Sequence, residues 1–269
     1  MMTPHDEGRA LDAAWEAVDG GDPEGALVAL EPLSARGDAP PEAALIACLA
    51  WLDLGEPLRA QALLAVAAPG IEEDDLDLRW ATASVDLALW RVAEAREGFE
   101  SIASEEPSPA ALMRLALAED LLGNPEAADR AMERAAAVDS DLALTPRLSG
   151  DDFESVVQRA ARELPPPFHD RLDEIAVVID PVPSLELGRS QPADTPPDAL
   201  GLFVGPSDLD RHPELSGVPS PTIYLYQRNI ERACRSVEEL EAEIRITLLH
   251  EFGHALGFDE DGVDALGLG

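Results

Sequence analysis

The sequence predicts an α+β protein, with an all-α helical repeat in residues 1–145 and a small α+β domain in residues 149–269. A turn-and-helix pattern recurs at a constant interval through the first half of the chain. In the second half, short apolar or alternating segments typical of strands precede a long amphipathic helix. The chain of 269 residues has room for two domains of ordinary size, each with its own core.

The repeat is marked by a turn of glycine, a polar residue and proline. Clear copies begin at Gly21, Gly55 and Gly123, and a degenerate copy without glycine or proline is expected at Leu89, which makes every step 34 residues. This period is that of tetratricopeptide-type helix pairs, which bury their apolar faces only by stacking. The region therefore resembles the tetratricopeptide superfamily, with several signature aromatic positions degenerate. The resemblance implies a surface that recruits a peptide or protein; the alternative is a helical cap for the neighbouring domain.

The second half is expected to begin with a helix from Asp151 or Asp152 to Glu163. Strands are predicted over residues 174–180 and 200–204. Residues 181–221 hold nine prolines and are predicted to be mostly loop, which in a compact domain is commonly functional or disordered.

A third strand is predicted over Thr222–Tyr226, where polar and apolar residues alternate. Its tyrosines, Tyr224 and Tyr226, share one face. If this strand lines a catalytic cleft, either tyrosine can donate a hydrogen bond to a tetrahedral oxyanion. The alternative is that both simply pack with a polar tip exposed.

The last predicted helix carries two histidines at helical spacing. Ser236 opens a capping box, and the helix is expected to run through residues 237–258 without proline. His250 and His254 are four residues apart, so both imidazoles lie on one face and can bind one metal ion. Gly257 is a natural C-terminal stop, because a left-handed residue there reverses the chain.

The pattern HExxHxxGxxE indicates a catalytic zinc site. Glu251, beside the first histidine, can act on a water bound to the metal. Catalytic zinc usually takes three protein ligands and leaves one position for water. Glu260 is the expected third ligand from its spacing, with Asp259 and Asp261 as the main alternatives and His212 as an outside candidate.

Residues 151–269 resemble the minimal zincin-like metallopeptidase family of bacteria. The resemblance lies in the segments FESVVQRAARELPPPFHDRLDEIAVVID, LGLFVG and TIYLYQRNIERACRSVEELEAEIRITLLHEFGHALGFDEDGVDALGLG. It implies a zinc-dependent hydrolase fold, with an acidic ligand after the glycine that favours Glu260.

The predicted function is a metallopeptidase that binds Zn²⁺ through His250, His254 and Glu260, uses Glu251 as general base, and recruits its substrate through the helical repeat. Two alternatives are a binding scaffold with a structural or vestigial metal site, and a metal-dependent hydrolase acting on a non-peptide amide.

Charge and composition narrow the partners. The net charge is −35, from 54 acidic residues against 19 basic ones, all of them arginine. Such a charge repels phosphate backbones and anionic membranes, whereas a basic peptide or protein is attracted. Cys48 and Cys234 are too few and too far apart for a disulfide framework. The N-terminus has no signal-peptide pattern, and no apolar run approaches the roughly 18 residues of a membrane span. A bacterial, cytoplasmic protein is expected.

Overall fold

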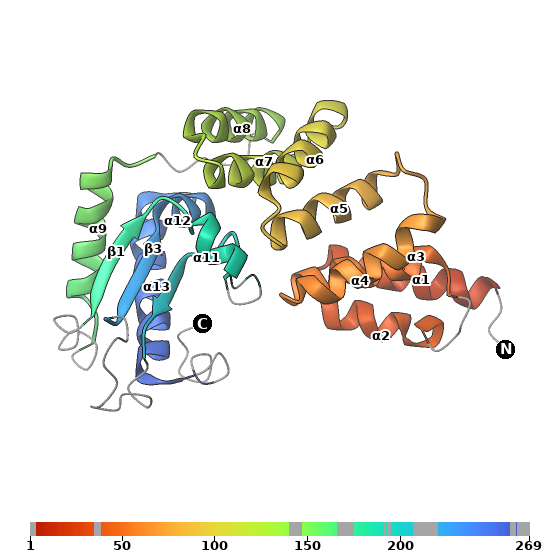
Figure 1. Cartoon of the computed structure of the whole chain (residues 1–269), viewed down its shortest axis with the longest axis horizontal. Helices are drawn as coiled ribbons and strands as arrows, with labels where there is room; N and C mark the ends of the chain where they lie inside the picture. Colours follow the sequence, from red (N-terminus) through yellow and green to blue (C-terminus); the bar gives the residue numbers. More distant parts are fainter. Residues whose placement is uncertain are drawn as a thin grey trace. The chain divides into compact units, whose positions relative to one another are not determined.

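The computed structural model describes residues 4–34, 39–139, 147–165, 175–190, 192, 195–206, 220–258 and 262. It confirms the predicted α+β class, with helices through the first half of the chain and a small sheet in the second (Figure 1). Contacts divide the chain into two compact units. Unit 1 comprises Met1–Val138 and Leu185–Pro197, and unit 2 comprises Asp139–Ser184 and Asp198–Gly269. The predicted domain limits, 1–145 and 149–269, remain a prediction.

Unit 1 consists largely of helical hairpins, each made of two successive helices joined by a short turn (Figure 1). Proline opens several of these helices, at a position where its missing N–H leaves no helical hydrogen bond unmade. The helices are α1 (Pro4–Asp19), α2 (Pro23–Ser34), α3 (Pro41–Asp53), α4 (Pro57–Ala67), the short 3₁₀ turn η1 (Ala68–Gly70), α5 (Leu76–Ala88), α6 (Val92–Glu105), α7 (Pro109–Leu121) and α8 (Pro125–Val138).

The turns inside the hairpins share one backbone geometry. Each contains a residue at positive φ: 72° at Gly21, 70° at Gly55, 59° at Trp90 and 78° at Gly123. The amide that follows this residue donates to the carbonyl five residues earlier, at 2.8–2.9 Å, as in a Schellman motif. The repeated turn is therefore real, but its degenerate copy is centred on Trp90, one residue later than the predicted Leu89. Tryptophan takes the left-handed position that glycine fills in the other turns.

Trp90 also contacts a segment of the chain about 100 residues further on. Its side chain is 1% exposed, and its indole Nε1 donates to the carbonyl oxygen of Thr195 at 3.0 Å. Gly188, in the helix α11 (Leu185–Ser190), lies so close to the indole that a Cβ at this position would overlap the ring. The segment Leu185–Pro197 belongs to unit 1, and Trp90 is one of the residues that contact it. α11 falls in the stretch predicted as mostly loop, since its short sequence carries no helical periodicity.

The sheet of unit 2 confirms the predicted strands to within two residues. Its order is β1-β3-β2, with β1 parallel and β2 antiparallel to the central β3. Ile223 and Leu225 of β3 are fully buried, as the alternating pattern predicts. The strands are β1 (Ala176–Asp180), β2 (Gly201–Val204) and β3 (Thr222–Tyr226).

Three helices complete the described part of unit 2 around this sheet: α9 (Gly150–Arg162), α12 (Gln227–Ala233) and α13 (Val237–Leu256). α9 and α13 match the predicted helices and share the core beneath the sheet with β3. α12 was not predicted, because its seven residues follow a strand directly and carry no capping side chain.

Across the described residues, no helix has the length and hydropathy that a membrane span requires. Cys48 and Cys234 are both buried as free thiols.

Candidate active site

α13 sets the orientation of the predicted metal-binding residues. Ser236 caps its first turn, where the hydroxyl oxygen accepts from the Glu239 amide at 3.1 Å. An apolar stripe along the helix faces the core and fixes its rotation. The stripe is the predicted one, with exposures of 0–4%: Leu240, Ile244, Leu248, Phe252 and Ala255. The histidines consequently project from a different face of the helix and are only partly buried.

The two histidines converge on one point. Their Nε2 atoms are 3.1 Å apart, and their ring centroids are 4.8 Å apart at an interplanar angle of 77°. Two nitrogens bound to one tetrahedral zinc ion, with Zn–N bonds of about 2.0–2.1 Å, lie about 3.3 Å apart. The arrangement of His250 and His254 therefore fits two ligands of a single ion.

The end of α13 determines which nitrogen His254 offers. Gly257 has a φ of 97° and ends the helix, as predicted. The reversal brings the carbonyl oxygen of Phe258 to 3.0 Å from Nδ1 of His254. A carbonyl only accepts, so Nδ1 carries the proton and Nε2 keeps its lone pair in the neutral imidazole. This backbone contact prepares His254 for metal binding through Nε2.

Glu251, the predicted general base, is buried between α13 and the sheet. Only 6% of the Glu251 surface is exposed to solvent. A Cβ built at Gly201, the first residue of β2, would lie 3.0 Å from the Oε1 atom of Glu251. The carboxylate thus lies directly against the strand backbone.

The predicted third ligand cannot be placed with the histidines. Glu260 and its alternatives Asp259 and Asp261 lie outside the described residues, as does His212. Within the described residues, no group of three or more histidine, cysteine or acidic side chains is arranged to hold a metal. The two imidazoles fit zinc, and the assignment of the third ligand remains a prediction.

One known protein family matches the region that contains the histidine pair. Residues 172–269 match the zincin-like metallopeptidase family. The match spans the whole sheet together with α13, and it leaves out unit 1 up to α8 and also α9. It confirms the resemblance that the sequence showed and suggests a metallopeptidase hydrolase of a class that normally binds zinc. No curated protein matches the chain.

In this zincin-like region the two predicted tyrosines lie side by side on β3. The rings of Tyr224 and Tyr226 are stacked, with centroids 6.5 Å apart and an interplanar angle of 14°. Tyr226 is 1% exposed. Burial raises the pKa of its phenol, and the neighbouring carboxylates of Asp180 and Glu251 raise it further. Tyr226 therefore stays protonated and keeps its O–H as a donor.

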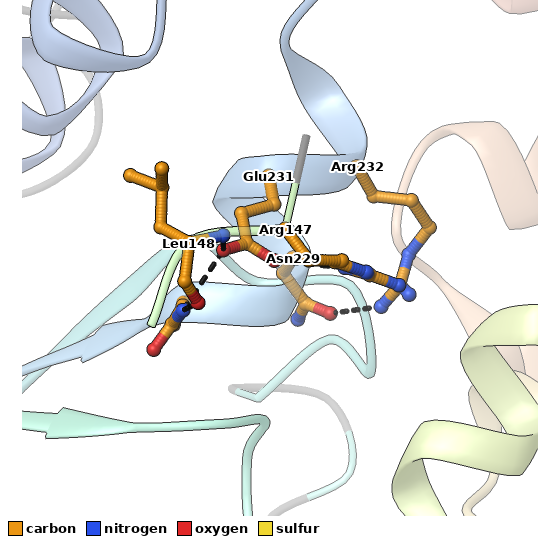
Figure 2. Close-up of polar contacts among 6 residues, drawn as sticks. Arg147, Leu148, Asn229, Glu231 and Arg232 are labelled. Carbon is orange, nitrogen blue, oxygen red and sulfur yellow. Dashed lines mark hydrogen bonds and ion pairs between the residues drawn. The ribbon is translucent and has the colours of Figure 1, made fainter. Parts of the chain in front are cut away.

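The polar anchor of α12 was not anticipated from the sequence (Figure 2). Glu231, whose side chain is 1% exposed, accepts from Arg147 Nη1 and the Leu148 amide, both at 3.0 Å, and from Gln227 Nε2 at 2.8 Å. Asn229, on the same short helix, donates to the carbonyl of Ala199 at 2.7 Å. Through these hydrogen bonds α12 connects the segment before α9 with the segment before β2.

The sequence alone gives Gly201 no role beyond its place in the LGLFVG segment. A glycine inside a strand pattern is a sign that another group approaches the backbone closely. Its identity as the residue next to Glu251 depends on how β2 packs against α13, which is a contact between residues far apart in the chain.

Proposed function

We propose that the protein is a zinc-dependent metallopeptidase whose centre is the histidine pair of α13. The observation that carries this proposal is the 3.1 Å separation of the two Nε2 atoms, with Glu251 buried beside them on the same helix. The family match over residues 172–269 supports the same reaction class.

In this proposal His250, His254 and Glu260 hold the zinc ion. Bound zinc supplies a Lewis acid that polarises the substrate carbonyl and lowers the pKa of a coordinated water. The hydrogen bond from His254 Nδ1 to the Phe258 carbonyl keeps that ring in the orientation and tautomer that a ligand needs. The acid at position 260 follows the chain reversal at Gly257, and this reversal supports its return toward the histidines.

Glu251 is proposed as the proton carrier. Its carboxylate accepts a proton from the attacking water and delivers it to the nitrogen of the leaving amine. Enclosure between α13 and β2 limits the positions open to this carboxylate, which favours a short, defined proton path. Tyr226 is proposed to stabilise the oxyanion, because its phenol stays protonated and lies near Glu251.

The helical repeat of unit 1 is proposed to recruit a basic peptide or protein substrate. Residues 1–150 carry 30 acidic residues and 10 arginines. In unit 1 the pKa of Asp77 is raised, first by burial and then by the neighbouring carboxylates of Asp75, Asp19 and Glu42. A cationic partner offsets this crowding of negative charge. The affinity of unit 1 for such a partner should therefore fall as salt is added.

Zinc content and hydrolysis test the proposal together. The purified chain should contain one zinc per molecule and should cleave fluorescein-labelled histone, a basic protein of the proposed substrate class. Glu251→Gln should keep the zinc and lose about 10²–10⁴-fold in kcat, because only the proton carrier is removed. Glu243→Gln is the matched control, since it makes the same change two turns earlier on α13.

A folded protein without zinc would favour the alternative of a helical-repeat scaffold with a vestigial site. Zinc without cleavage of histone, but with hydrolysis of simple amides, would favour a non-peptide hydrolase. Undiminished hydrolysis by Glu251→Gln would refute the proposed proton transfer.

A further inference from the structure

The first residue of β2 occupies a position where the fold has no room for a side chain. A Cβ built at Gly201 would lie 3.0 Å from both Cγ and Oε1 of Glu251, and 2.7 Å from Cγ2 of Thr247. Cβ atoms in real proteins are essentially never found closer than 3.0 Å to such neighbours. A side chain at position 201 therefore requires Thr247 to shift, and it requires Glu251 to give way by a few tenths of an ångström.

Hydrogen bonds hold the backbone at Gly201 and just before it, so the strand cannot easily withdraw. The two preceding carbonyls are fixed: Ala199 accepts from Asn229 Nδ2 at 2.7 Å, and Leu200 accepts from the Tyr226 amide at 2.9 Å. Gly201 itself is paired with β3 in the antiparallel ladder. The strand would have to break these contacts to make space for a methyl group.

The helix on the other side is equally constrained. Leu248 and Phe252, which flank Glu251 on α13, are 0% and 1% exposed in the core of unit 2. Thr247, one turn before Glu251, is 5% exposed, and its branched side chain has few rotamers open to it. The most movable of the groups around the missing Cβ is the carboxylate end of Glu251.

We propose that Gly201 is a positioning residue for Glu251, in that the absence of a side chain at position 201 creates the space that the carboxylate occupies. The inference rests on the proposed function, in which Glu251 carries the proton. Moving a flexible carboxylate costs the fold little, but it displaces the atoms that must reach the attacking water. Gly201 therefore acts through Glu251 and does not touch the substrate.

Gly201→Ala in the full chain tests this inference. The variant should fold, bind one Zn²⁺ per chain with the parent's affinity, and melt within a few degrees of the parent. Its kcat on fluorescein-labelled histone should fall by about 100-fold, the effect of misplacing a catalytic group by about 1 Å, while KM changes little. A crystal structure of the variant should show the Glu251 carboxylate displaced.

Two further variants separate positioning from general damage. Thr247→Ser removes the methyl group that makes the shortest contact, so adding it to Gly201→Ala should recover part of the lost kcat, whereas Thr247→Ser alone should behave as the parent. Gly150→Ala is the matched control, because a Cβ at position 150 of α9 meets nothing within 4 Å. The double variant also serves as the test protein if Gly201→Ala fails to fold.

Parental kcat in Gly201→Ala, or a crystal structure with Glu251 unmoved, would overturn the inference. Loss of zinc from Gly201→Ala, with no recovery in the double variant, would also overturn it, because the residue would then serve the metal site as a whole. The crystal structure decides the matter even for a parent that hydrolyses no histone. Failure of the proposed function and failure of the Gly201 inference are therefore distinguishable.

Discussion

Replacing Trp90 by glycine separates two opposing effects in one residue. The backbone at Trp90 has a φ of 59°, in the region where the equivalent turns carry Gly21, Gly55 and Gly123. A left-handed conformation costs an L-residue about 1–2 kcal/mol, a penalty that glycine does not have. For the turn alone, Trp90→Gly should therefore increase the free energy of unfolding.

The side chain acts in the opposite direction and should dominate. The indole is 1% exposed, packs against Gly188 and donates to the Thr195 carbonyl. Truncating a buried tryptophan costs about 3–5 kcal/mol. After the gain in the backbone is subtracted, Trp90→Gly should destabilise unit 1 by about 1–4 kcal/mol. The loss should be concentrated where the indole makes its contacts.

Hydrogen exchange followed by mass spectrometry locates the loss. Amides of α11 and Thr195 should exchange much faster in Trp90→Gly, while α7 and α8 should change little. Gly123→Ala is the control, because its added Cβ meets nothing within 4 Å and its φ of 78° isolates the backbone penalty. Urea unfolding should show a loss of about 1 kcal/mol for this control. A Trp90→Gly protein that is more stable than the parent, or that leaves exchange in α11 unchanged, would refute the reasoning.

The other predictions concern the metal, a buried ion pair and a thiol. Glu260→Ala should weaken zinc binding in a chelator competition far more than Asp261→Ala, and the reverse order would move the ligand by one residue. Arg147→Ala should lower the free energy of urea unfolding by about 3 kcal/mol, because it leaves the carboxylate of Glu231 buried without its guanidinium. Adding Glu231→Gln should recover part of this loss, and strictly additive effects would contradict the pairing. Burial raises the pKa of Cys48 to about 12, so iodoacetamide at pH 8 should label this thiol only after unfolding. Between about pH 9 and pH 12 the thiol ionises only in the unfolded chain, so the free energy of unfolding should fall as the pH rises through this range.

Short-range patterns in the sequence predicted much of this molecule. The turns at Gly21, Gly55 and Gly123 were predictable because glycine tolerates positive φ and proline favours a helix start. The ends of α13 follow from Ser236 and Gly257 for similar local reasons. The two histidines meet because residues four apart share a helix face, a property of the helix alone. The assignment of Glu260 rests on spacing and on the family resemblance, and it stays a prediction.

Contacts between distant segments were decided only by the tertiary structure. Trp90 follows Leu89 in the degenerate copy of the turn, and only the fold shows that its indole donates a hydrogen bond to a carbonyl 105 residues away. The sequence does not distinguish Glu231 from the other acidic residues, whereas the structure shows that it accepts hydrogen bonds from Arg147 and Leu148. Periodicity and capping act between neighbours along the chain and carry no information about which remote backbone will approach. The close passage of Gly201 past Glu251 arises when the strand packs on the helix, and so the space for the Glu251 side chain is a property of the packed fold.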